Sequence, residues 1–400
     1  MEWLLSPLSF FVMVPRWVMG SVVGSGFFLY YFLEVAKQPA VFCSDGKFKR
    51  FLYSHMPLLN KKFWPTIWCF ESRAQTLVST FIRQRIFPGV KYNSREVLEL
   101  ADGGQVGLDW LLAENDEPTT PTVIFLPGLT GASQADYIQG LVESAKNLGL
   151  RSVVFNNRGI GGIPLKTPRT YCAANYEDLS EVIEHVRNKY PDSPLACTAI
   201  SMGGLILGNY LAHEPEKANG YLQACLIISV PWDARLASES VEQPVLNMLL
   251  NRYLASCLTE VVRGVRDVLE PTQKWEMEKV LSSKTVREFD TNFTVKQFGY
   301  NDVYEYYAQA SMHNKLHHVK VPVLCLSAAD DPFQPLQGIP MDKASVLDNV
   351  AIVVTARGGH IGFIEGLWPF RRNQYLFKFF SQFFEAVFKN QEAFLQSCQL

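Results

Sequence analysis

The sequence predicts an α/β fold built on a mostly parallel sheet with helices on both faces. Three observations support this fold class. From about residue 95 onward, short apolar runs alternate with segments of helical period. The apolar runs are nearly continuous, as expected of strands that are buried on both faces. The chain enters this pattern through a hairpin, so we expect antiparallel strands first and repeated β-α units afterwards.

The hairpin is formed by REVLEL and QVGLDWLLAE, which flank the glycine-containing turn ADGG. The strands expected after it are 122–126, 151–155, 195–200, 221–230, 321–327 and 349–355. The helices expected between them are 133–148 and 176–190, with a further helix after residue 201. Because the carboxyl ends of parallel strands meet at one edge of a sheet, we expect the functional residues along that edge.

An insertion of about 90 residues separates the strand ending at residue 230 from the strand beginning at 321, which is far longer than an ordinary connection. Its first half, PVLNMLLNRYLASCLTEVVRGVRDVL, has a helical period, and Pro244 is suited to a helix start. We expect residues 232–320 to form a helical cap over the substrate. The alternative is a helical pair that only covers the sheet.

The N-terminal region differs from the rest of the chain. Trp17 to Leu33 carries no charged side chain, at the short end of the roughly 17 to 25 residues that span a bilayer. A cleaved signal peptide is the alternative, but the bulky ending FLYYFL offers no small-residue cleavage site. We therefore expect an uncleaved membrane anchor over residues 1–40. Residues 41–94 are expected to be an irregular lead-in segment, followed by the main domain over 95–400.

Composition excludes several classes of function. An apolar share of 48% and a formal net charge of -2 argue against a disordered chain and against a nucleic-acid partner. The eight cysteines are scattered, with no C-x-x-C pair and no Cys/His cluster at zinc spacing. We therefore expect no metal, no cofactor and no disulfide framework.

The stretch LACTAISMGGLILGNYLAH places Ser201 at the junction of an apolar strand and a helix. Small residues surround it, with Ala199 before it and Gly203 and Gly204 after it. A tight strand-to-helix turn of this kind is typical of a nucleophile elbow, which exposes a serine hydroxyl above the sheet. The alternative is a small residue that fills a turn.

Two later loops carry the partners that a nucleophilic serine needs, in the chain order serine, acid, histidine. Asp330 and Asp331 follow the strand 321–327, and His360 follows the strand 349–355. We expect Asp331 to orient the imidazole, and Asp330 to cap the turn through backbone amides. His360 is flanked by glycines, which we interpret as space for the imidazole.

This order of residues predicts acyl transfer. His360 would accept the proton of Ser201 as the serine attacks a carbonyl carbon, and Asp331 would stabilise the imidazolium. The resulting oxyanion needs hydrogen-bond donors. We expect these to be the backbone N–H groups of Met202, which follows the nucleophile, and of Leu129, in the loop after the strand 122–126.

Seven short motifs spread over nearly the whole chain resemble those of the AB hydrolase 4 family. They are LPGLTG (126–131), FNNRG (155–159), TPRTYC (167–172), SMGG (201–204), VREFD (286–290), DDPF (330–333) and GGHIGF (358–363). The resemblance implies an α/β-hydrolase fold and a membrane-anchored serine hydrolase of lipid or other carboxylic esters. It puts Ser201, Asp331 and His360 at the matching triad positions. It also implies a single-pass protein of type II.

Orientation is the point on which the residues and the resemblance disagree. The basic residues Lys37, Lys47, Lys49 and Arg50 outnumber Arg16, and this bias predicts a cytosolic C-terminal part. We expect the anchor to lie in the endoplasmic reticulum membrane. The sequon at Asn292 would be used only if the catalytic part were lumenal.

The expected substrate is an amphiphilic acyl ester, such as a phospholipid or an acylglycerol, held beside the bilayer by the anchor. The cap offers apolar side chains that could line an acyl channel. They are Leu246, Met248, Leu249, Leu250, Tyr253 and Leu254, followed by Tyr304, Tyr306 and Tyr307. The alternative function is a catalytically silent α/β-hydrolase fold that acts as a binding or scaffold protein.

Overall fold

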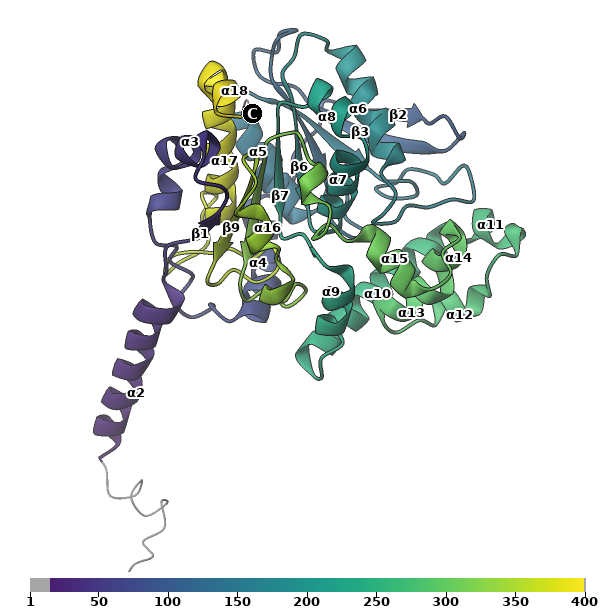
Figure 1. Ribbon diagram of the computed structural model, residues 1–400. Helices are drawn as coiled ribbons and strands as arrows, with labels where there is room; N and C mark the ends of the chain where they lie inside the picture. Colours follow the sequence, from purple (N-terminus) through teal and green to yellow (C-terminus); the bar gives the residue numbers. More distant parts are fainter. Residues whose placement is uncertain (1–14, 399–400) are drawn as a thin grey trace, which may run out of the picture.

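The computed structural model describes residues 15–398 and contains one nine-stranded sheet, in the order β1-β9-β8-β7-β6-β4-β5-β3-β2 (Figure 1). The strands are β1 (Ala40–Phe42), β2 (Ser94–Glu99), β3 (Gln105–Leu111), β4 (Thr122–Leu126), β5 (Arg151–Asn156), β6 (Leu195–Ile200), β7 (Ala224–Ile228), β8 (Val323–Ala328) and β9 (Val350–Thr355). The six strands β4 to β9 pair in parallel, and β1, β2 and β3 join antiparallel. The predicted fold class is therefore confirmed.

Helices cover both faces of the sheet because successive strand residues point in opposite directions. In β4, Ile124 and Leu126 face a core shared with α6 (Glu177–Lys189) and α7 (Met202–His213). Val123 and Phe125 face the opposite core, which is shared with α3, α5 and α17. Those three helices are α3 (Lys47–His55), α5 (Asp136–Asn147) and α17 (Tyr375–Lys389). The near-continuous apolar runs of the sequence reflect this burial on both faces.

The prediction of an irregular lead-in segment is wrong. Its start forms β1, which adds an edge strand beside β9 with Ala40 opposite Val354. The segment continues through α3, the 3-10 turn η2 (Pro57–Asn60) and α4 (Ser72–Ile86). A strand of three residues is too short to show a period. Helix α3 is amphipathic, and its apolar side, which includes Phe48 and Leu52, is buried. The basic residues between the apolar ones made this pattern difficult to recognise in the sequence.

Two element boundaries also differ from the prediction. The expected strand 221–230 is shorter, because α8 (Pro215–Tyr221) precedes β7 and Ser229, with φ of 50°, ends it. The long cap helix α10 (Leu246–Gly264) begins after Pro244 rather than at it. Val245 has a φ of 68°, outside the helical region, so Pro244 lies in the turn before the helix.

The insertion forms a group of helices with its own apolar cluster, which includes Val262, Leu269, Trp275 and Phe293. These helices are α9 (Ala234–Val241), α10, α11 (Arg266–Leu269), η3 (Glu270–Thr272), α12 (Met277–Leu281), α13 (Val286–Phe289), η4 (Asp290–Thr294), α14 (Val295–Phe298) and α15 (Val303–Ala310). Figure 1 shows them beyond the end of the sheet at which α7 begins. The remaining elements are η5 (Leu316–His318), η6 (Leu336–Gly338), α16 (Met341–Ala344) and α18 (Gln391–Cys398).

The apolar N-terminal segment forms one projecting helix, α2 (Arg16–Tyr30), which continues as the π-helical turn η1 (Tyr31–Val35). The helix is long and apolar enough to cross a membrane, with a mean hydropathy of 1.4. It extends away from the domain, and its C-terminal end is the part that packs (Figure 1). There the Tyr31 hydroxyl donates a hydrogen bond to the Pro65 carbonyl oxygen at 2.5 Å. Residues 1–14 of the predicted anchor lie outside the described residues.

Candidate active site

Ser201 stands at a sharp turn between β6 and α7, with φ of 53° and ψ of -122°. Its amide donates to the Ile228 carbonyl oxygen at 2.9 Å, which ties the turn to the neighbouring strand. A positive φ costs free energy for a residue with a side chain, and such strain is frequent at functional sites. The stretch thus forms the predicted strand, turn and helix, and the backbone is strained at Ser201, the residue in the turn.

The small residues around Ser201 are explained by close backbone packing. A Cβ atom on Gly203 would lie 2.5 Å from the Leu126 carbonyl oxygen and 2.6 Å from that of Pro127. A Cβ atom on Gly204 would lie 2.8 Å from the side chain of Ile227. Neither glycine can therefore carry a side chain without moving the strand beside it.

Ser201, His360 and Asp331 form one hydrogen-bonded chain. His360 Nε2 lies 2.8 Å from Ser201 Oγ, and His360 Nδ1 lies 2.9 Å from Asp331 Oδ2. A carboxylate can only accept, so Nδ1 carries the proton and Nε2 is left to accept the serine proton. Asp331 and His360 are buried at 6% and 7% exposure, whereas Ser201 is partly exposed. The three residues singled out in the sequence are thus brought together in the geometry of general-base activation.

The neighbouring carboxylate of Asp330 points elsewhere. It accepts a hydrogen bond from the Gly359 amide at 3.0 Å and lies 4.0 Å from Arg357. Burial raises the pKa of Asp330 to about 7. The two adjacent acids therefore have separate surroundings. Asp331 accepts a hydrogen bond from the imidazole of His360, whereas Asp330 accepts one from the backbone of the loop that carries His360.

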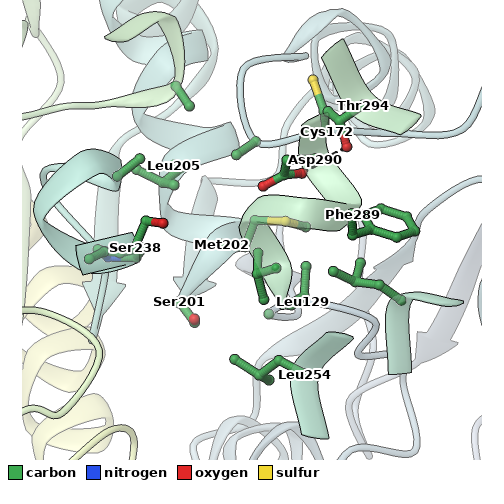
Figure 2. Close-up of a pocket in the computed structure, with 18 of the residues that line it drawn as sticks. Leu129, Cys172, Ser201, Met202, Leu205, Ser238, Leu254, Phe289, Asp290 and Thr294 are labelled. Carbon is green, nitrogen blue, oxygen red and sulfur yellow. Dashed lines mark hydrogen bonds between the residues drawn. The ribbon is translucent and has the colours of Figure 1, made fainter. Parts of the chain in front are cut away.

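Leu129 and Met202 line the same cavity as Ser201 (Figure 2). Among the hydrogen bonds of residues 15–398, neither of their backbone amides donates to another group. The loop comes close because Gly128 has no side chain: a Cβ there would lie 3.1 Å from Ser201 Cβ. Two amides without a partner beside a serine hydroxyl can bind a developing oxyanion.

Two tyrosines that were not among the predicted site residues fix the loop that carries Leu129. The Tyr137 hydroxyl accepts from the Gly128 amide at 2.9 Å, and the Tyr171 hydroxyl accepts from the Thr130 amide at 3.2 Å. Burial raises the pKa of both phenols, so both hydroxyls stay protonated. The amides on either side of Leu129 are therefore held, which fixes the backbone position of Leu129 beside the site. Tyr171 belongs to the motif TPRTYC, and that motif was the one sequence feature that pointed to this residue.

Helix α4 of the lead-in segment holds the histidine loop, and the sequence did not predict this contact. The Thr76 hydroxyl accepts from the His360 amide at 2.9 Å and donates to the Ser72 carbonyl oxygen at 2.8 Å. A Cβ on Gly359 would collide with that same carbonyl oxygen, and one on Gly362 would lie 2.9 Å from the backbone of Gln75. The glycines flanking His360 therefore make room for α4. That they also clear space for the imidazole stays a prediction.

Arg83, also on α4, is fully buried and binds the same loop. Its Nη2 donates to the Ile361 carbonyl oxygen at 2.7 Å and also to that of Gly362. Burial lowers the pKa of Arg83 to about 10, which leaves the guanidinium charged at neutral pH. Asp136 lies 3.8 Å away and balances part of this charge. The histidine loop is thus held through both its amide and its carbonyl groups.

A cavity of about 280 Å³ begins at Ser201 and extends beneath the cap (Figure 2). Leu254, Tyr306 and Tyr307 line it, as expected from the sequence. The other six side chains proposed for an acyl channel are not among its lining residues. They are Leu246, Met248, Leu249, Leu250, Tyr253 and Tyr304. The reason is that the first two turns of α10 extend past the cavity, so that helix reaches it through Leu254, Leu258, Val261 and Val262.

One carboxyl group lies in the wall of this largely apolar cavity. Asp290 accepts hydrogen bonds from the Thr294 hydroxyl at 2.8 Å and the Tyr307 hydroxyl at 3.1 Å. Burial raises the pKa of Asp290 to about 7. Among residues 15–398, no three His, Cys, Asp or Glu side chains gather in a way that could hold a metal ion.

Comparisons with known proteins agree with this architecture. Residues 121–367 match the family described as alpha/beta hydrolase fold. Phospholipase ABHD3 of Mus musculus is 44% identical over 363 residues, covering 90% of this chain and 86% of that protein. Monoacylglycerol lipase ABHD2 of Mus musculus is 26% identical and covers 82% and 80% of the two chains. The solved Pyrococcus furiosus esterase Pf2001 has a TM-score of 0.47 at 15% identity and covers 75% of this chain and 90% of that one.

Proposed function

The chain belongs to the alpha/beta hydrolase fold family, and we propose that it is a membrane-anchored serine hydrolase that cleaves acyl esters of phospholipids or acylglycerols. That it is an ester-hydrolysing enzyme is supported by relatives named as a phospholipase and a monoacylglycerol lipase. Its motifs further suggest the AB hydrolase 4 family, where they are similar to those of α/β-hydrolase domain-containing proteins 1 and 3. The observation that carries the proposal is the chain of contacts from Ser201 through His360 to Asp331.

In the proposed mechanism Ser201 Oγ attacks the ester carbonyl carbon while its proton passes to His360 Nε2. The carbonyl oxygen becomes an oxyanion that accepts from the amides of Leu129 and Met202. The carbon–oxygen bond to the leaving alcohol then breaks, and His360 returns the proton to that alcohol. Water repeats the attack on the acyl-enzyme, with His360 as base, and releases the carboxylic acid. Asp331 stabilises the imidazolium in both steps.

A lipid acyl chain suits the cavity. Its lining is mainly leucine, valine and aromatic side chains, and it begins at the reactive serine. Each methylene moved from water into such a lining contributes about 0.8 kcal/mol. A chain of several methylenes therefore adds enough binding free energy to distinguish a lipid ester from an acetyl ester.

We also propose that Arg16–Val35 is the single membrane span, in the endoplasmic reticulum membrane. The proposed organisation is an anchor over 1–40, a lead-in segment over 41–94 and a hydrolase domain over 95–400 with the cap at 232–320. The family resemblance favours a type II orientation, against the charge bias around the helix. Glycosidase sensitivity of the wild type that is absent from an Asn292→Gln variant would support a lumenal domain, whereas its absence from both proteins would leave the orientation open.

Covalent labelling tests the nucleophile. A fluorophosphonate probe should label the wild-type chain and fail to label Ser201→Ala, while Ser256→Ala, an exposed serine of the cap, should label normally. Equal labelling of Ser201→Ala would reject the assignment, and absence of labelling in all three proteins would favour a silent scaffold. Values of kcat/KM for acyl chains from acetyl to palmitoyl then test the lipid assignment, which requires a rise with chain length.

A further inference from the structure

Exposed apolar side chains are concentrated along one edge of the domain. Outside residues 16–35, sixteen large apolar side chains of the described chain are exposed, and eleven of them lie in three short segments. We call these eleven the docking surface. They are Trp64, Trp68, Leu77 and Phe81; Val245, Leu246, Leu249 and Tyr253; and Leu367, Trp368 and Phe370. A contiguous apolar patch on a protein surface is unusual unless it binds a partner or a membrane.

Side-chain contacts connect the three segments to each other and to the N-terminal helix. The ring of Trp64 lies 5.9 Å from that of Phe32 at the end of the helix. Trp68 Nε1 donates to the Leu367 carbonyl oxygen at 3.0 Å. At the start of α4, Arg73 Nε donates to Asn247 Oδ1 of α10 at 2.8 Å. The three segments therefore lie next to one another, from the base of the proposed anchor to the first turn of the cap helix.

Part of the surface lies on the helix that lines the catalytic cavity. Leu77 and Phe81 follow Arg73 at intervals of four residues, so the three share one stripe of α4. The first turns of α10 carry Leu246 and Leu249, and the next turns of the same helix line the cavity. Figure 1 shows α2, α4 and α9 on the same side of the domain.

Basic side chains accompany the apolar ones. Lys61, Lys62, Arg252 and Arg371 are exposed and make no ion pair with any residue that the structure describes. Lys62 Nζ lies 5.9 Å from the centre of the Trp64 ring. Tryptophan and tyrosine favour the membrane–water interface, and unpaired cations favour anionic headgroups.

We propose that the docking surface inserts into the interfacial layer of a phospholipid bilayer and holds the opening of the cavity against it. The proposal rests on the proposed function, because it takes the N-terminal helix as the anchor and a lipid ester as the substrate. Its physical consequence is that an acyl chain passes from the bilayer into the cavity without crossing water. The anchor supplies attachment, and the docking surface supplies orientation.

Two matched variants of the full chain are reconstituted in phosphatidylcholine vesicles with some anionic lipid. They distinguish an effect on membrane docking from effects on membrane attachment and on the catalytic reaction. The docking variant carries Leu77→Gln, Phe81→Gln, Leu246→Gln and Leu249→Gln. The control variant carries Val97→Gln, Leu336→Gln, Val346→Gln and Leu395→Gln, four exposed apolar residues outside the docking surface. We expect the docking variant to lose at least tenfold in kcat/KM on a phospholipid ester in the vesicles. Its kcat/KM on a soluble butyrate ester, its fluorophosphonate labelling and its resistance to carbonate extraction should match those of the control.

Equal activity of the two variants on vesicles would overturn the proposal, and so would a parallel loss on the soluble ester in the docking variant alone.

An environment-sensitive label tests insertion without depending on any activity. Leu249→Cys and Val346→Cys are each labelled in a Cys257→Ser, Cys398→Ser background, which removes the two partly exposed native thiols. Doxyl-labelled lipid should quench the label at position 249 and not the label at position 346. An unquenched label at 249 in an anchored protein overturns docking even if lipid hydrolysis is observed. Quenching at 249 without hydrolysis of any lipid ester would reject the proposed function alone, and shielding from water without lipid quenching would indicate a protein partner instead.

Discussion

Replacing Gly203 by alanine should remove most of the catalytic activity while leaving the triad intact. The new Cβ would lie 2.5 Å from the Leu126 carbonyl oxygen and 2.6 Å from the Pro127 carbonyl oxygen. Ordinary contacts begin near 3.4 Å, so these backbone atoms must retreat by close to 1 Å. They lie directly before the loop that presents the Leu129 amide, and that amide would move with them.

Loss of one oxyanion donor typically lowers kcat by about 10² to 10³. We therefore expect a fall in kcat of that size for Gly203→Ala, measured on a soluble ester so that membrane binding plays no part.

Gly208→Ala is the matched control in the same helix. There the added Cβ would meet the flexible side chain of Met312 at 2.8 Å, far along α7 from the serine. Overpacking of this kind costs about 1 to 3 kcal/mol of stability. Its Tm should fall while its kcat remains near that of the wild type. If Gly203→Ala kept its kcat within threefold of the wild type, or if both variants lost activity equally, the inferred link between the elbow glycine and the Leu129 amide would be refuted.

Three further predictions concern the acids and the histidine loop. Asp331→Asn should lower kcat by about 10⁴ and Asp330→Asn far less; the reverse order would transfer the orienting role to Asp330. Thr76→Val should lower kcat more than it changes KM, because it leaves the buried amide of His360 without its acceptor at a cost of about 1 to 3 kcal/mol. Thr76→Ser, which keeps the hydroxyl, should have a kcat near that of the wild type. A kcat as low as that of Thr76→Val would show that the hydroxyl does not position His360. Burial raises the pKa of Asp290 to about 7, so the stability contributed by its neutral form is complete at low pH and is lost as the pH rises toward 7. Asp290→Asn should therefore raise Tm more at pH 8 than at pH 5, and an equal shift at both pH values would contradict this assignment of the raised pKa.

The parts of the molecule that follow from local pattern were predictable. The strands around Ser201 have continuous apolar runs, and the parallel arrangement puts the loops of Asp331 and His360 at the same edge of the sheet. Chain order and strand ends were therefore enough to select those three residues before their contacts were known.

The parts that depend on contacts between distant segments were not predictable. Thr76 and Arg83 lie on an ordinary amphipathic helix, and nothing in its period indicates which loop it meets. The residues of the cap that line the cavity differ from the predicted ones for a related reason. Helical period shows which side chains share a face of α10. The point at which α10 crosses the cavity depends instead on the packing of the whole insertion. Tyr137 and Tyr171 act through single hydrogen bonds to backbone amides; the motif TPRTYC includes Tyr171, but nothing in it indicates which amide that hydroxyl contacts.

The pairing of β1 with β9 can form only after almost the whole chain has been synthesised. Ala40 leaves the ribosome soon after the proposed anchor, whereas its partner Val354 follows almost the entire domain. At about 5 to 20 residues per second, the wait is roughly 15 to 60 s. Throughout that time β1 has unpaired backbone groups close to the membrane, a condition that favours incorrect pairing. The sheet therefore cannot be completed until β9 has been synthesised, and any truncation before residue 350 leaves a protein whose first strand has no partner.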